Sequence, residues 1–64
     1  MKRTKFIKYL SENGCYLSRE GSNHSVFVNQ RNNNISVVPR HPDINDILAV
    51  KICKDLDIPK ITSH

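Results

Sequence analysis

A glycine, two small polar residues, a histidine and then a β-branched run occupy residues 21–28, and this stretch constrains the fold more than any other. Gly21 allows backbone angles that other residues avoid, which favours a tight turn. Residues 26–28 are Val-Phe-Val and favour an extended strand. His24 is therefore expected at the start of a strand, anchored by the backbone and still open to solvent.

The segment before this turn predicts one helix and one strand. Residues 4–13 repeat apolar side chains at three- and four-residue spacing, which is typical of an amphipathic helix with Phe6 in the core. Thr4 would cap the start of this helix, and Gly14 would end it in the left-handed conformation. Residues 15–20 are expected to form the first strand.

Two more strands are expected after the turn. Residues 24–29 form the second strand and residues 35–38 the third, which Pro39 ends. The polar loop at residues 30–34 contains three asparagines, which tolerate positive φ and suit a hairpin. Three short strands joined by tight turns predict an antiparallel meander.

The last predicted element is a second helix. Asn45 can cap its start. Its apolar stripe, read at helical spacing, comprises Ile44, Ile47, Leu48, Ile52 and Leu56. Pro59 ends the element, and residues 60–64 are expected to form a flexible tail that includes His64.

The expected architecture is α+β, with the order α-β-β-β-α and a three-stranded antiparallel sheet. Two amphipathic helices need a common apolar surface, so both are expected on one face of the sheet, with the other face open. This is the arrangement of the double-stranded RNA-binding domain. With 64 residues, the chain is expected to be a single domain, 1–64, whose thin core allows only a shallow surface site.

The net charge of +4 favours an anionic partner such as RNA, although a solubilising basic surface explains it equally well. No segment is apolar for long enough to cross a bilayer, so no membrane contact is expected. Cys15 and Cys53 lack metal-ligand spacing and are expected to be reduced, buried thiols. These features indicate a cytoplasmic protein without a metal or a small-molecule cofactor.

His24 suits acid–base chemistry on RNA, because histidine gains and loses protons near neutral pH. RNA supplies its own nucleophile, the 2′-hydroxyl group, so cleavage needs a positioned base and no metal. The amides around Gly21 and Ser22 could stabilise the attacked phosphate, and Arg40 could bind it through two hydrogen bonds. His41 is a candidate second acid if the hairpin brings it near His24, or otherwise a connector residue without a role.

Other interpretations of these residues compete with catalysis. A histidine in a small basic domain is more often a surface or packing residue than a catalyst. Ser22 has no evident histidine–carboxylate relay, which argues against a serine nucleophile. His24, His41 and an aspartate lack the short ligand spacing of a metal site.

Two sequence elements, taken with this order of helices and strands, are similar to a known family. Gly21, Ser22 and His24 form a Gly-Ser-x-His element, and residues 37–41 read Val-Val-Pro-Arg-His. Together they resemble HicA, the toxin of HicA/HicB toxin–antitoxin systems, over about residues 5–58. The resemblance implies an mRNA interferase with a fold like the double-stranded RNA-binding domain. It also implies His24 as the catalytic residue and a HicB-type antitoxin that covers the active face.

The functional hypothesis is therefore a metal-independent endoribonuclease toxin that cleaves mRNA with His24 as general acid or base. The candidate RNA-binding residues are Lys5, Lys8, Arg40, His41 and Lys51. The family usually has glycine and threonine at the start of the last helix, where this chain has Asn45 and Asp46. The alternative hypothesis is a non-catalytic module that binds double-stranded RNA or a partner protein.

Overall fold

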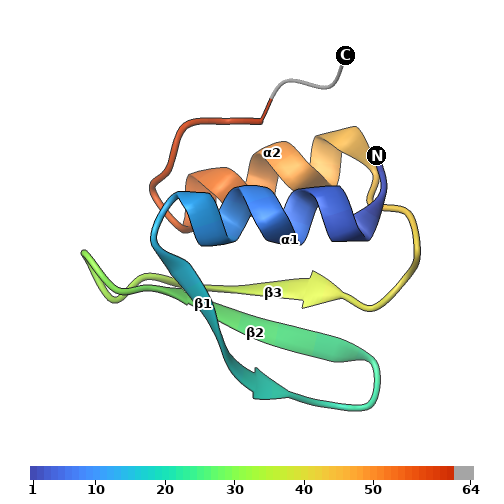
Figure 1. Ribbon diagram of the computed structural model, residues 1–64, viewed down its shortest axis with the longest axis horizontal. Helices are drawn as coiled ribbons and strands as arrows, with labels where there is room; N and C mark the ends of the chain where they lie inside the picture. The colour runs from blue at the N-terminus through green and yellow to red at the C-terminus, as the bar shows by residue number, and fades with distance from the viewer. Residues whose placement is uncertain (62–64) are drawn as a thin grey trace.

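Two helices lie side by side over one face of a three-stranded antiparallel sheet and leave the other face bare (Figure 1). The structure, a computed structural model, describes residues 1–61. Its elements are α1 (Arg3–Glu12), β1 (Cys15–Glu20), β2 (His24–Asn29), β3 (Ile35–Pro39) and α2 (Asp46–Asp55). The strands follow the order β1-β2-β3, so β2 is central and both of its neighbours are edges. The predicted α-β-β-β-α fold is confirmed.

Helix α1 begins earlier than the sequence predicts, and Thr4 does not cap it. Lys2 is the N-cap and makes no side-chain capping bond, while Thr4 lies inside the first turn. The amide of Arg3 instead donates to the carbonyl oxygen of Pro42 at 2.8 Å. A segment distant in sequence therefore supplies an acceptor for one of the free amides at the start of the helix. At the other end, Gly14 has φ +83°, which confirms the predicted left-handed stop.

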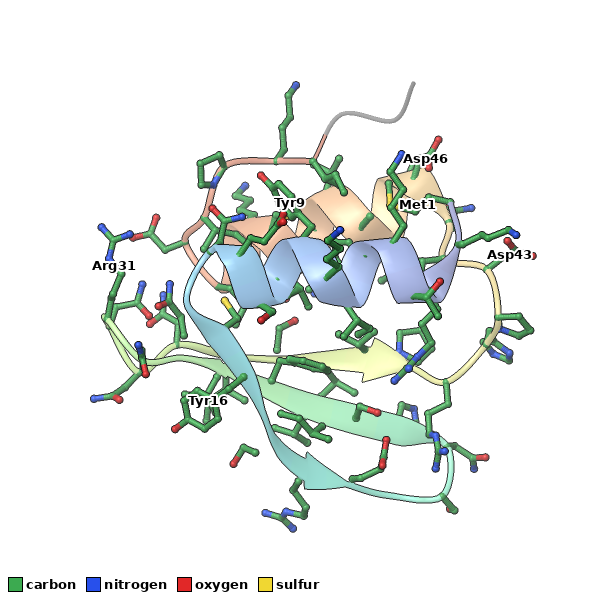
Figure 2. All side chains as sticks on the ribbon, in the orientation of Figure 1. Met1, Tyr9, Tyr16, Arg31, Asp43 and Asp46 are labelled. Carbon is green, nitrogen blue, oxygen red and sulfur yellow. The ribbon has the colours of Figure 1, made fainter. Side chains whose placement is uncertain are left out.

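The N-terminal ends of both helices are joined through the segment around Ile44. The Met1 ammonium group donates to the carbonyl oxygen of Ile44 at 2.9 Å, and the amide of Ile44 donates to the Met1 carbonyl oxygen at 2.7 Å. The same ammonium group lies 3.6 Å from the Asp46 carboxylate (Figure 2). These contacts hold the start of α1 beside the connector that follows β3.

Helix α2 has the predicted cap but a different buried face. The Asn45 side chain accepts a hydrogen bond from the amide of Ile47 at 2.8 Å, which confirms the cap. The predicted stripe is wrong for Ile47, whose side chain is 81% exposed, while Ala49 and Cys53 are buried instead. The reason is that Ile44 precedes the extended cap residue, so a helical count that starts at Ile44 gives the wrong phase.

Alternation along the strands assigns each side chain to the helix face or to the open face. In β2, Ser25, Phe27 and Asn29 are buried beneath the helices, so the residues between them face the opposite way. The open face is apolar and exposed at Tyr16, Ile35 and Val37, whose exposed fractions are 49, 60 and 46%. The register of β1 against β2 shifts between Leu17 and Arg19, an irregularity that the sequence did not predict.

The core lies between the helices and the sheet. Its fully buried side chains include Phe6, Leu10, Val38, Ile52 and Leu56. Cys15 and Cys53 belong to this core as free thiols, and burial raises the pKa of both.

Ile61, which the sequence assigns to a tail, packs against the same core, while residues 62–64, including His64, lie outside the described part. Between residues 1 and 61, no helix is both long and apolar enough to cross a membrane.

Candidate functional site

His24 is the first residue of β2 and its side chain is exposed, as the turn-and-strand pattern predicts. It pairs across the sheet with Pro39, the last residue of β3. Because Ser25 points toward the helices, His24 points to the open side of the sheet. The imidazole is therefore carried on a paired backbone but stays accessible to a substrate.

A shallow hollow of about 270 Å³ lies around this histidine. Its lining residues come from the β1–β2 turn, the ends of the paired strands and the connector: Ser22, Asn23, His24, Pro39, Arg40 and His41. The hairpin thus brings His24, Arg40 and His41 to one place, although they are up to 17 positions apart in sequence. A hollow of this size and polarity suits a phosphate or a nucleotide sugar and is too small for a large cofactor.

Hydrogen bonds between backbones hold the turn that precedes His24. The amide of Gly21 donates to the carbonyl oxygen of His24 at 2.7 Å, and the amide of Arg40 donates to the carbonyl oxygen of Asn23 at 3.3 Å. The predicted role of the Gly21 amide as a phosphate donor would therefore require this bond to open, and the role of the Ser22 amide stays a prediction. Gly21 also does not have a positive φ. Among the glycines of residues 1–61, Gly14 is the one with a positive φ.

Arg40 reaches the hollow but is also bound by the turn. Its Nη1 donates to the carbonyl oxygen of Gly21 at 3.2 Å, and its Nε lies 3.8 Å from Oε1 of Glu20. Both side chains of the ion pair are roughly half exposed, so water and salt weaken their attraction. A substrate phosphate can therefore compete with Glu20 for this guanidinium group.

A cluster on the other side of the strands, which sequence reasoning missed, adjoins the same turn. Nε of Arg3 donates to the carbonyl oxygen of Pro39 at 2.9 Å, and Nη2 donates to Oγ of Ser25 at 2.8 Å. Oγ of Ser25 in turn donates to Oε1 of Glu20 at 3.0 Å. One signal was present in the sequence, because Ser25 occupies a core-facing position of its strand and a buried hydroxyl needs partners. Nothing local identifies Arg3.

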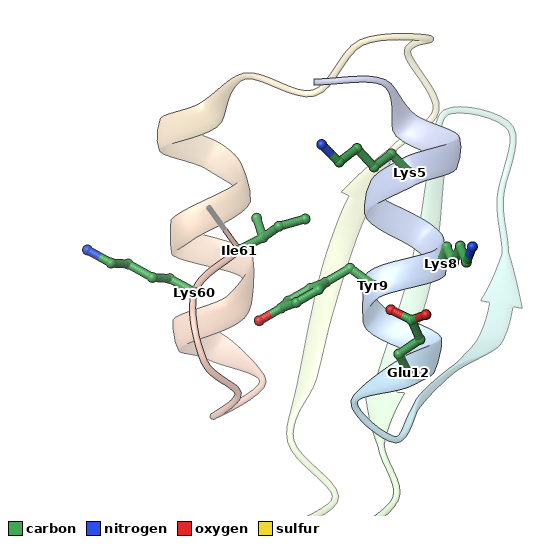
Figure 3. Close-up of a pocket in the computed structure, with 6 residues that line it drawn as sticks. All are labelled: Lys5, Lys8, Tyr9, Glu12, Lys60 and Ile61. Carbon is green, nitrogen blue, oxygen red and sulfur yellow. The ribbon is translucent and has the colours of Figure 1, made fainter. Parts of the chain in front are cut away.

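The predicted RNA-binding lysines do not lie in the His24 hollow. Lys5 and Lys8 line a different hollow of about 400 Å³ next to α1 and the C-terminal segment (Figure 3). There the Tyr9 hydroxyl donates to the carbonyl oxygen of Pro59 at 2.6 Å, and burial raises the pKa of Tyr9. Lys51 of α2 makes an ion pair of 3.0 Å with Asp55. Of the predicted RNA-binding set, therefore, Arg40 and His41 are the members that line the same hollow as His24.

The described residues contain no group of three or more histidine, cysteine or acidic side chains that could hold a metal ion. The chemically competent groups around the hollow are two imidazoles and one guanidinium group. Such a set can bind an anion and exchange protons with it.

Comparisons with known proteins give one match. The model of a family described as the HicA toxin of bacterial toxin-antitoxin systems matches residues 3–58. No curated protein and no solved structure matches the chain significantly. The matched range covers every helix and strand, including the turn, the hollow around His24 and the connector. The chain therefore belongs to the HicA toxin family and is a toxin of a bacterial toxin–antitoxin system.

Proposed function

We propose that this toxin is an endoribonuclease that cleaves mRNA, with His24 as its general acid or base. The observation that carries the proposal is the shared hollow of His24, Arg40 and His41 in a member of the HicA toxin family. An exposed imidazole on a paired strand, beside a cation, is the arrangement that acid–base cleavage of a phosphodiester needs.

In the proposed reaction, His24 accepts the proton of a 2′-hydroxyl group of the RNA. The 2′-oxygen then bonds to the neighbouring phosphorus, and the bond from phosphorus to the 5′-oxygen breaks. A second acid protonates the departing oxygen, and His41 is the candidate because it lines the same hollow. The products are a 2′,3′-cyclic phosphate and a 5′-hydroxyl group.

Arg40 is the proposed contact for the attacked phosphate. Its guanidinium group can turn from Glu20, which is 3.8 Å away, to an arriving phosphate. Contacts to phosphates carry no sequence information, so cleavage that depends on them should show a weak sequence preference.

A HicB-type antitoxin is the proposed protein partner. The open face of the sheet supports this part of the proposal, because Tyr16, Ile35 and Val37 expose apolar surface on it. His24 lies on the same side of the sheet, so a protein that covers this face would also block the hollow.

The test compares the purified protein with His24→Ala on a long single-stranded RNA in the presence of EDTA. We expect the wild type to cut and His24→Ala to be slower by about 10²- to 10⁴-fold, which is the usual contribution of a positioned base. Circular dichroism would check that both proteins are folded. His41→Ala is the companion variant. The His41 side chain lines the same hollow, but His41 lies in the connector outside the strands.

Each other outcome assigns a different role. If neither protein cuts and both bind RNA, the non-catalytic RNA-binding module becomes the better account. If the wild type and His24→Ala cut equally, His24 has no role in catalysis. A strong loss in His41→Ala alone would then move the base to His41.

A further inference from the structure

We propose that Arg3 is a positioning residue for His24, a role that rests on the proposed ribonuclease function. Arg3 does not line the His24 hollow. It lies at the start of α1 and lines a hollow between α1 and β1, together with Glu20 and Ser25. Ser25 and His24 are neighbours whose side chains point to opposite faces of the sheet. Arg3 therefore contacts the strand on the helix side, opposite to the His24 side chain.

The guanidinium fork of Arg3 holds the two strand ends that present the histidine. Nη2 binds the hydroxyl of Ser25 at 2.8 Å, and Ser25 directly follows His24. Nε binds the carbonyl oxygen of Pro39 at 2.9 Å, and Pro39 is the partner of His24 across the sheet. One rigid, planar group thus fixes both strands at the level of the candidate catalytic residue.

The cluster continues from Arg3 to the turn itself. Oγ of Ser25 donates to Glu20 at 3.0 Å, Glu20 pairs with Arg40 at 3.8 Å, and Arg40 donates to the Gly21 carbonyl oxygen at 3.2 Å. These links pass from the helix, through the sheet, to both sides of the hollow. The turn at residues 21–23 is exposed, so little apolar packing holds it in place. These polar links hold the turn instead.

Strand ends next to exposed loops open more readily than strand centres. Without the two hydrogen bonds of Arg3, the ends of β2 and β3 should separate more often, and the His24 imidazole should lose its fixed position. Misplacement of a catalytic group by about 1 Å can reduce turnover by about 10²-fold. The Arg3 side chain does not line the hollow, so substrate affinity should change little.

The experiment compares Arg3→Met with Lys2→Met, which removes the same charge from the neighbouring position. The Lys2 side chain is exposed and makes no capping bond. We expect kcat of Arg3→Met to fall about 10- to 10²-fold while KM stays within about twofold. Lys2→Met should change both parameters by less than about twofold, as expected for one screened surface charge.

Amide hydrogen exchange supplies a readout that does not depend on catalysis. In Arg3→Met, the amides of Gly21 and Arg40 should exchange faster, because their acceptors His24 and Asn23 lie on the loosened turn. The amide of Leu56, which donates to Ile52 in the core, should stay as protected as in the wild type. Faster exchange at Leu56 as well would show general destabilisation and overturn the positioning role.

Two further variants keep the proposal falsifiable if Arg3→Met folds poorly. Arg3→Lys keeps the charge but reaches only one of the two acceptors, so kcat should recover in part. Ser25→Ala removes the bridging hydroxyl, and its loss of kcat should not add to that of Arg3→Met.

The positioning role and the proposed function fail in different ways. Unchanged kcat and unchanged exchange in Arg3→Met, beside an inactive His24→Ala, would overturn the role of Arg3 alone. Full activity of His24→Ala would overturn the proposed function, and the role of Arg3 in catalysis would fall with it even if the turn loosens.

Discussion

The two ends of the β2–β3 hairpin are held by different kinds of interaction. At the loop end, the buried Asn29 side chain donates to the carbonyl oxygen of Leu56 at 2.8 Å and accepts from the amide of Arg31 at 2.9 Å. The groups in these two bonds are uncharged and shielded from bulk water in whole or in part. Such bonds stabilise the fold strongly, because water and solutes compete little for shielded groups.

At the opposite end, charged groups surround His24. Arg3, Glu20 and Arg40 are joined to one another through Ser25 or directly, and water reaches most of them. The half-exposed ion pair between Glu20 and Arg40 is weak, and an arriving anion can exchange with it, whereas the bonds of Arg3 are partly buried and lie outside the hollow. The loop end is therefore held by buried, uncharged bonds, while at the His24 end Arg3 holds the two strands and Arg40 can exchange its partner.

The largest effect is expected when the buried end is broken. Asn29→Ala should lower the free energy of unfolding by about 2–3 kcal/mol, because the Leu56 carbonyl oxygen loses the shorter of its two side-chain hydrogen bonds and the Arg31 amide loses its acceptor. This is a large share of the stability of a domain of this size. Urea denaturation followed by circular dichroism measures the loss, and cleavage per folded molecule should be unchanged.

Asn32→Ala is the matched control for Asn29→Ala. The Asn32 side chain is exposed and donates to the same Leu56 carbonyl oxygen at 3.3 Å. It should cost less than about 1 kcal/mol, as usual for a hydrogen bond in contact with water. Equal losses in the two variants would show that both asparagines of the loop region contribute equally, and would contradict a special role for the buried Asn29 side chain.

A smaller effect is expected at the charged end. Arg40→Met should raise KM for RNA by about three- to tenfold and lower the slope of log KM against log salt by about 0.7, the value for one phosphate contact on a single strand. Cleavage assays at several salt concentrations measure both quantities.

Lys54→Met removes the same charge from the exposed side of α2 and should leave the slope nearly unchanged. An equal change in both variants would mean that RNA senses only the net charge.

The sequence predicts those features that depend on neighbouring residues. The stop at Gly14 and the cap at Asn45 are decided by one side chain and its own turn, and both are confirmed. The shared position of His24 and His41 follows from the hairpin, since antiparallel pairing brings its two ends together. The burial of Ile47 was predicted wrongly because Ile44 lies outside the helix, where its backbone obeys no helical period.

The rest of the site depends on contacts between distant residues. Arg3 reaches Ser25 and Pro39 across 22 and 36 positions, and no local pattern distinguishes it from the other basic residues near the start of the chain. The use of the Gly21 amide within the turn is likewise settled by the pairing geometry and not by residue type. Composition predicts a basic surface, but only the packing separates Arg40 from Lys5.

The smallest effect is expected at Asp55, a carboxylate near the loop end. Lys51 and Ser36 donate to its Oδ2 at 3.0 and 3.1 Å, and these bonds, with that from Lys51 as the largest cause, lower the pKa of Asp55 below its ordinary value of 3.8. A carboxylate with a lowered pKa stabilises the fold above its unfolded pKa, and this contribution disappears as the pH falls through the folded value. Asp55→Asn should therefore lower Tm by a few degrees at neutral pH, and the difference from wild type should close at pH values well below 3.8. Thermal melts from neutral to strongly acidic pH measure this difference, and a gap that persists in acid would show that Asp55 acts through packing and not through its charge.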